Sequence, residues 1–186
     1  MMKKIAVLFH DGFEELEALS VVDVMRRAKI ECTMVGMNKL EVISSHQIKI
    51  AMDRIFDDTI ETYDAIVIPG GLPGATNLRD DSRVIKIIQK FNKANKIIGA
   101  ICAGPIVLEK AGIIEGKTVT CFPGFDTQLS SANYQEALVI TDNNIITGKG
   151  PAAALAFAYA LLDALGGNSE EIKESMQYKY LEKNIL

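Results

Sequence analysis

Short apolar runs alternate with longer amphipathic segments along the first half of this chain. The apolar runs are rich in β-branched residues and predict strands at residues 5–9, 30–35, 42–44, 48–52 and 65–68, and a further strand that starts at 96 and ends in Cys102. Apolar positions at helical spacing predict helices at residues 14–29 and 81–93. This alternation predicts an α/β fold, a mostly parallel sheet with helices on both faces.

The second half of the chain is expected to extend the same sheet. Strands are predicted at residues 118–121, 137–140 and 145–147, the last two joined by a tight turn at Asp142-Asn143-Asn144. Two helices should close the chain, one over 151–165 and one that starts at Ser169, whose hydroxyl can cap it. No internal repeat or linker interrupts the pattern, so residues 1–186 are expected to form a single domain.

Composition and charge narrow the class of protein. The chain has 186 residues, 48% of them hydrophobic, which suits one well-buried core. A net charge of −4 provides no basic field for nucleic acid or an anionic membrane surface. No apolar run approaches the ~20 residues of a membrane span, and the first residues show no export pattern. We therefore expect a cytoplasmic protein that binds neither nucleic acid nor membrane.

Three cysteines, Cys32, Cys102 and Cys121, are too few and too widely spaced for a zinc site or a disulfide scaffold, so free thiols are expected. Cys102 lies where a buried strand turns sharply into a helix. Such a turn places a thiol at the carboxyl edge of the sheet, near the positive end of a helix, where a thiolate is favoured. Inert burial is the alternative for any free cysteine.

Backbone amides near Cys102 can complete an oxyanion site. Because ligands of open α/β folds bind beyond the carboxyl ends of the strands, the loops after four strands should meet there. Gly70 and Gly71 let the backbone approach a ligand, so the amides of this pair and of Ala103 are candidate donors to a developing oxyanion. A tight turn without chemistry would explain the same glycines.

Four segments in this order resemble the DJ-1/PfpI (ThiJ) superfamily, and most closely its DJ-1 branch. They are Asp11-Gly12-Phe13-Glu14-Glu15-Leu16-Glu17, Asp64-Ala65-Ile66-Val67-Ile68-Pro69-Gly70-Gly71, Ala100-Ile101-Cys102-Ala103-Gly104-Pro105 and Gly148-Lys149-Gly150-Pro151. The resemblance implies a flavodoxin-like three-layer sandwich, a homodimer, and Cys102 as the reactive thiol. It also places Glu17 where the family has a carboxyl that hydrogen-bonds this thiol.

That pairing requires a protonated Glu17, because two adjacent anions in a poorly solvated pocket repel each other. We expect a raised pKa for Glu17 and a thiolate at Cys102, although a carboxylate exposed in a first helical turn is the alternative for Glu17. The resemblance implies a glyoxalase- or deglycase-type activity, in which Cys102 attacks a small α-oxoaldehyde and Glu17 moves the proton. The alternative is a stress-protective, chaperone-like redox sensor that uses oxidation of Cys102.

Three positions depart from patterns in the superfamily. Ala103 stands where the protease-like branch has a histidine, so a peptidase would lack its base. Phe122 stands where animal DJ-1 proteins have a histidine near the pocket, and His46 where they have an arginine of the partner subunit. A mechanism here must therefore work without a histidine at position 122.

The remaining candidates lie around the expected pocket. They are His10, Cys121, Phe122, Gly150 and Pro151, with Cys121 also a candidate resolving thiol. Glu14 and Glu15 are expected to act as charges at a helix start. Neither His10 nor His46 is expected to form a metal site with the carboxylates, and the loop from Gly70 lacks dinucleotide and phosphate-loop spacing, so no cofactor or metal is expected.

Overall fold

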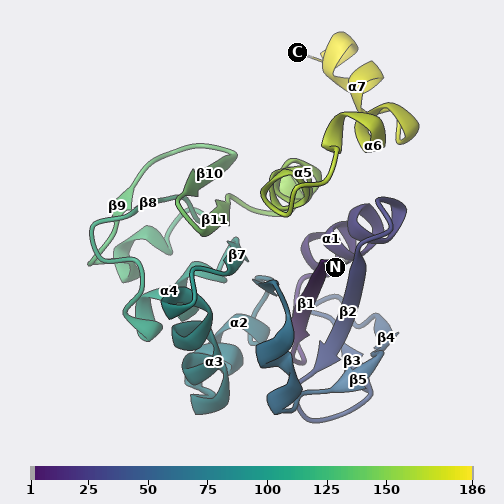
Figure 1. Cartoon of the computed structure of the whole chain (residues 1–186). Helices are drawn as coiled ribbons and strands as arrows, with labels where there is room; N and C mark the ends of the chain where they lie inside the picture. Colours follow the sequence, from purple (N-terminus) through teal and green to yellow (C-terminus); the bar gives the residue numbers. More distant parts are fainter. Residues whose placement is uncertain (1–2, 186) are drawn as a thin grey trace.

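The computed structural model describes residues 3–185 and has a central seven-stranded sheet (Figure 1). Its strand order is β10-β11-β7-β6-β1-β2-β5, and all neighbours are parallel except β10 and β11. The strands are β1 (Lys4–Phe9), β2 (Glu31–Gly36), β5 (Arg54–Ile55), β6 (Ala65–Ile68), β7 (Ile97–Ile101), β10 (Val139–Asp142) and β11 (Ile145–Gly148). The predicted mixed α/β fold with a mostly parallel sheet is confirmed.

Helices cover both faces of this sheet. One face carries α1 (Glu15–Arg27) and α5 (Ala154–Ala164), and the other carries α2 (Gly74–Asp80), α3 (Ser82–Lys93) and α4 (Pro105–Ala111). Side chains of the central strands alternate between the two cores. On β6, Ile66 and Ile68 pack toward α2, α3 and α4, whereas Ala65 and Val67 pack toward α1 and α5. Burial on both faces explains the unbroken apolar runs of these strands.

Smaller elements lie around the sheet. The predicted ribbon is confirmed as the antiparallel pair β3 (Glu41–Ile43) and β4 (Lys49–Ala51). Short 3₁₀ helices occur at η1 (Asp58–Thr62), η2 (Asp126–Gln128) and η3 (Pro151–Ala153), and η3 forms the first turn of the helix predicted over 151–165. Two helices follow α5 in place of the one predicted, α6 (Ser169–Ser175) and α7 (Tyr178–Ile185), and α7 projects from the body of the molecule (Figure 1).

The strand predicted at 118–121 does not join the main sheet. Only β8 (Thr118–Val119) is a strand, and it pairs with β9 (Asn133–Tyr134) in a separate two-stranded sheet. The segment is attached to the main sheet by hydrogen bonds to side chains of that sheet, and not by backbone pairing with one of its strands. Asp142 Oδ2 accepts from the Thr118 amide at 2.8 Å, and Thr147 Oγ1 accepts from the Thr120 amide at 2.9 Å.

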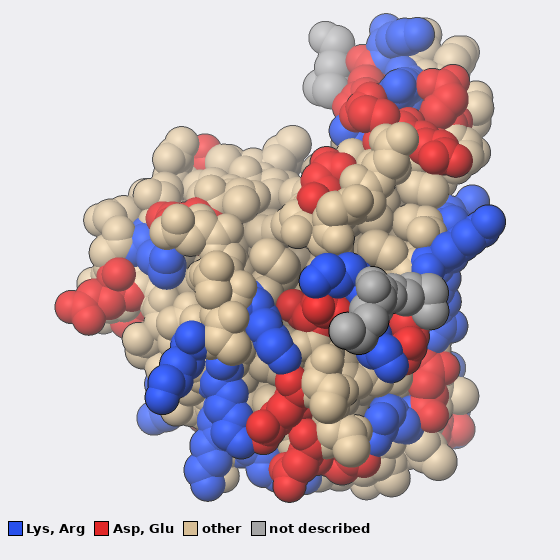
Figure 2. All heavy atoms as spheres, in the orientation of Figure 1, with Lys and Arg blue, Asp and Glu red and all other residues tan. Residues whose placement is uncertain are grey.

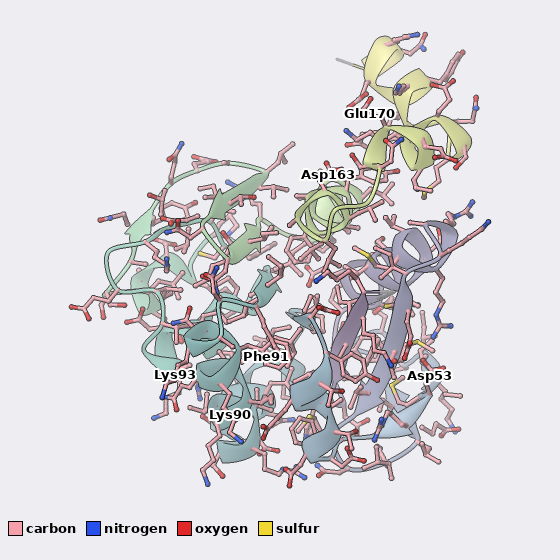
Figure 3. All side chains as sticks on the ribbon, viewed as in Figure 1. Asp53, Lys90, Phe91, Lys93, Asp163 and Glu170 are labelled. Atoms are coloured by element: carbon pink, nitrogen blue, oxygen red, sulfur yellow. The ribbon has the colours of Figure 1, made fainter. Side chains whose placement is uncertain are left out.

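The cap predicted for the helix at Ser169 is also wrong by one residue. Asn168 is the N-cap of α6 and accepts from the Glu171 amide. The Ser169 hydroxyl donates to Asp163 Oδ2 at 2.8 Å, which joins the start of α6 to α5, the helix on which Asp163 lies (Figure 3). The side chain thus ties two helices together instead of capping one.

Figure 2 shows positive and negative side chains next to one another over the lower part of the molecule and on the C-terminal helices, whereas the upper left of this face is largely uncharged. None of the helices within residues 3–185 is both long enough and apolar enough to cross a bilayer.

Replacement of Thr147 by valine tests the side-chain attachment of the 118–121 segment. Thr147 is 1% exposed, and loss of its hydroxyl leaves the buried Thr120 amide without its acceptor. We expect Thr147→Val to lower the free energy of unfolding in urea by about 1–3 kcal/mol. The exposed Thr141→Val on the neighbouring strand is the matched control and should change it by less than about 0.5 kcal/mol. Equal effects of the two substitutions would contradict this account.

Candidate active site

Four loops meet at the carboxyl edge of the sheet. β1, β6, β7 and β11 are neighbours and run parallel, so the segments that follow them lie at one edge. These segments begin with His10, Pro69, Cys102 and Lys149. This edge is where the sequence places the candidate nucleophile and its surroundings.

Cys102 follows β7 directly and has an unusual backbone conformation. Its φ is +63°, in the left-handed region that side chains other than glycine rarely adopt. Hydrogen bonds hold the residue on both sides, since its amide donates to the Gly148 carbonyl at 2.9 Å and its carbonyl accepts from the Phe122 amide at 3.0 Å. The residue is 8% exposed. The expected sharp turn is therefore present, and the cysteine in it is almost completely buried.

Glu17 lies in the first turn of α1 and is completely buried, which excludes an exposed carboxylate. Its Oε2 accepts from the Gly70 amide at 2.8 Å, while Oε1 is buried and has no partner in hydrogen-bond geometry among the described residues. Burial raises the pKa of Glu17 to about 7, although interactions with the Cys102 thiol and the Gly70 amide oppose the rise. The direction agrees with the expectation from sequence.

The Cys102 thiol shows the opposite of the expected direction. Burial raises its pKa, and the negative charge of Glu17 and the contact with its carboxyl raise it further, whereas the amides of Ala103 and Gly71 lower it. The two groups form a coupled pair that releases one proton much more easily than the second. A thiolate at Cys102 therefore requires that Glu17 be protonated, so that its negative charge is absent and the two amides can stabilise the charge on the sulfur.

Gly70 is required by the close approach of the Cys102 and Glu17 side chains. A Cβ atom at this position would lie 2.6 Å from Cys102 Cβ and 2.7 Å from Glu17 Oε2. Gly71 next to it has a φ of +85°. Because the Gly71 and Ala103 amides both act on the Cys102 sulfur, the turn and the residue after Cys102 each place one donor beside the candidate nucleophile.

The other candidates take different positions. His10 Nδ1 lies 3.0 Å from Asn77 Nδ2 and lines a cavity of about 240 Å³ whose lining includes neither Cys102 nor Glu17. Cys121 is fully buried in the core cluster that contains Ala103, whereas Cys102 belongs to the other cluster. Burial and Asp126 raise the pKa of Cys121 to about 11, which disfavours a thiolate there.

Phe122 and Gly150 lie together beside Cys102. The Phe122 amide bonds the Cys102 carbonyl, and the Phe122 ring lies over Gly150, where an added Cβ would be 3.0 Å from its Cδ2. Pro151 follows at the start of η3.

Glu14 contributes more than the helix-start charge expected from sequence. It is 8% exposed and is the N-cap of α1, where its Oε2 accepts from the Glu17 amide at 2.8 Å. Its charge also raises the pKa of Glu17. The three-residue spacing from Glu14 to Glu17 was the available signal for this cap.

His46 lies beside the carboxyl groups of Glu14 and Glu15. Its Nδ1 is 2.8 Å from Glu15 Oε1, and this pair raises the pKa of His46. Ligand atoms of Glu14, Glu15 and His46 lie within 4.8 Å of one another. His46 is two-thirds exposed, and Ser44 interacts with Glu15, so the group is explained by hydrogen bonding within the chain.

Comparisons with known proteins agree with this fold. The model of the DJ-1/PfpI family matches residues 3–164. The chain is 37% identical over 171 residues to the Parkinson disease protein 7 homolog of Danio rerio, with 89% of this chain and 90% of that protein covered. The crystal structure of Drosophila melanogaster DJ-1beta superposes with a TM-score of 0.91 at 32% identity, covering 95% of this chain and 98% of the other.

A plant relative is longer. Protein DJ-1 homolog B of Arabidopsis thaliana is 36% identical over 175 residues, which cover 92% of this chain and 40% of that protein. The chain thus spans less than half of the length of this relative.

The raised pKa of Glu17 predicts how stability depends on pH. The carboxyl titrates at 4.5 in the unfolded chain and at about 7 in the folded one. Between these values the unfolded state loses a proton that the folded state keeps, so stability present below pH 4.5 is lost as the pH rises toward 7 and beyond. Relative to Glu17→Gln, the wild type should lose about 3 kcal/mol of unfolding free energy over this interval, measured by urea denaturation. Parallel pH curves for the two proteins would contradict burial of an ionisable carboxyl here.

Proposed function

This chain belongs to the DJ-1/PfpI family, and on that premise we propose that it is a cofactor-independent enzyme of glyoxalase or deglycase type that acts on α-oxoaldehydes. The observation that carries the proposal is the buried Glu17 carboxyl, with a pKa of about 7, beside a thiol that two backbone amides also approach. A nucleophile, a proton carrier and an oxyanion site are the three parts that the reaction needs.

The reaction begins with attack of the Cys102 sulfur on the aldehyde carbon. A C–S bond forms and the carbonyl electron pair moves to oxygen; that oxygen, stabilised by the amides of Gly71 and Ala103, takes the proton that leaves the pair formed by Cys102 and Glu17, which gives the hemithioacetal. One proton then moves from the former aldehyde carbon to the neighbouring ketone carbon and the hydroxyl proton passes from the first oxygen to the second, through an enediol, which leaves a thioester. Water cleaves the thioester, releases a 2-hydroxy acid and restores the thiol. Overall the substrate gains one water, the aldehyde carbon is oxidised and the ketone carbon is reduced.

Glu17 is the residue proposed to carry the proton between the two carbons. A pKa of about 7 lets the same carboxyl give and take a proton near neutral pH. Phe122 has no titratable atom, so in this proposal Glu17 carries the proton without a second acid or base at position 122. Members of this family commonly form homodimers, and we propose the same for this chain.

A redox-sensing role is the second candidate, and the Glu17 carboxyl and the two backbone amides around the Cys102 sulfur support it, because these groups can stabilise an oxidised sulfur as well as an oxyanion. In the first step the sulfur takes one oxygen from the peroxide and water is released, which gives a sulfenic acid. A second peroxide gives the sulfinic acid in the same way. The protonated Glu17 and the two amides are then placed to donate to the sulfinate oxygens.

Turnover of methylglyoxal to lactate tests the enzymatic proposal. We expect Cys102→Ser to lose activity at least about 10³-fold, and Glu17→Gln, which keeps a hydrogen-bond donor but carries no transferable proton, to lose about 10²-fold or more. Cys32→Ser is the matched control, because Cys32 is a buried thiol on β2 outside this site, and its activity should stay within about threefold of the wild type. Activity that survives in Cys102→Ser would refute the mechanism.

Peroxide titration followed by intact mass separates the two candidates. If the chain is mainly a sensor, the wild type should gain two oxygens at Cys102 without turning over methylglyoxal, and Glu17→Gln should still be oxidised because its amide can donate to a sulfinate. Cys102→Ser should gain no oxygen under these conditions. Oxidation that is spread equally over Cys32, Cys102 and Cys121 would contradict a selective sensor.

A further inference from the structure

Phe122 is a large apolar side chain that remains exposed beside the candidate nucleophile. Its amide donates to the carbonyl of Cys102 at 3.0 Å, so the two residues are direct neighbours across two loops. Even so, 43% of Phe122 is exposed, whereas Phe9, Phe13, Phe91 and Phe157 are fully or almost fully buried. An aromatic ring left open at this place is a surface on which a ligand can pack.

The backbone around Phe122 is fixed by a tight turn. The Phe122 carbonyl accepts from the Phe125 amide at 3.1 Å, with Pro123 and Gly124 between them. Gly124 has a φ of +91°, and this combination of proline and glycine is the pattern of a type II turn. The side chain of Asp126 accepts from the Gly124 amide at 2.9 Å and holds the turn from its far side. Phe122 is therefore hydrogen-bonded through both its amide and its carbonyl.

Gly150 supports one face of the ring. Gly150 is buried, and a Cβ atom there would lie 3.0 Å from Cδ2 and 3.7 Å from Cε2 of Phe122. A side chain at position 150 would force the ring to move. The neighbouring Lys149 turns its ammonium group to Glu136 at 2.6 Å, so its charge is already paired. One edge of the ring thus lies against a glycine, and the exposed part of Phe122 is free of a charged neighbour at Lys149.

These contacts lead to a substrate class. An α-oxoaldehyde held with its aldehyde carbon at the Cys102 sulfur carries its variable group on the next carbon, within reach of residues that border Cys102. We propose that Phe122 is a specificity-determining residue that packs against this group and makes aryl or large apolar α-oxoaldehydes better substrates than methylglyoxal. The inference rests on the proposed function and adds which substituent on the ketone carbon of the substrate the site prefers.

Steady-state kinetics with phenylglyoxal and methylglyoxal test this inference. In the wild type, kcat/KM for phenylglyoxal should exceed that for methylglyoxal about tenfold. Phe122→Ala should remove most of this advantage by raising KM for phenylglyoxal much more than KM for methylglyoxal, with kcat for phenylglyoxal little changed, because the ring binds ground state and transition state alike. Gly150→Ala should reduce the advantage in the same direction, since the added methyl group displaces the ring.

Tyr180→Ala is the matched control, because Tyr180 is an exposed aromatic residue on α7, and it should leave both substrates unchanged. Circular dichroism of each variant shows whether it is folded. If the wild type turns over neither aldehyde, the proposed function itself fails. If methylglyoxal is turned over but phenylglyoxal is no better, or if Phe122→Ala affects both substrates equally, the reaction stands and the role of Phe122 is refuted.

Discussion

The burial of one carboxyl group, that of Glu17, is the constraint on which the site depends. A fully buried carboxyl is costly to ionise, and the Gly70 amide binds only one of its two oxygens. The other oxygen has no hydrogen-bond partner among the described residues, and the same carboxyl interacts with the Cys102 thiol. The glycine at position 70, the left-handed backbone of Cys102 and the cap formed by Glu14 all serve to bring these two side chains together without a clash.

The pattern of apolar and polar residues predicted a strand correctly where the residues of the segment itself determine the structure. The run at 65–68 is wholly apolar and is bounded by Pro69 and Gly70, and it forms a strand with those limits. The segment at 118–121 has a similar apolar character, yet its amides are taken by Asp142 and Thr147, which lie more than 20 residues away in the chain. The pattern of a segment cannot show that a distant side chain will replace a neighbouring strand.

In the candidate site, too, some features could be predicted from the sequence and others depend on the folded structure. The motifs located Cys102, Glu17 and the glycine turn, and the resemblance assigned their roles. The sequence alone presents three similar glutamates at 14, 15 and 17, and only the hydrogen bond to the amide of Gly70, more than 50 residues away, singles out Glu17. The direction of the Cys102 pKa was missed for a related reason. The favourable amides are local and could be anticipated, but the opposing effect of burial comes from the whole fold.

The left-handed backbone of Cys102 sets the chemistry proposed for this thiol against the stability of the fold. A residue without a side chain would adopt that conformation more easily, so the thiol is held in a backbone conformation that costs stability. Replacement of the cysteine by glycine would relieve this strain, and the variant would still fold although it lacks the thiol. Cellular quality control, which recognises unfolded chains, cannot detect such a loss. Only selection on the chemistry can keep a cysteine at this position, and protein abundance is no guide to whether the site works.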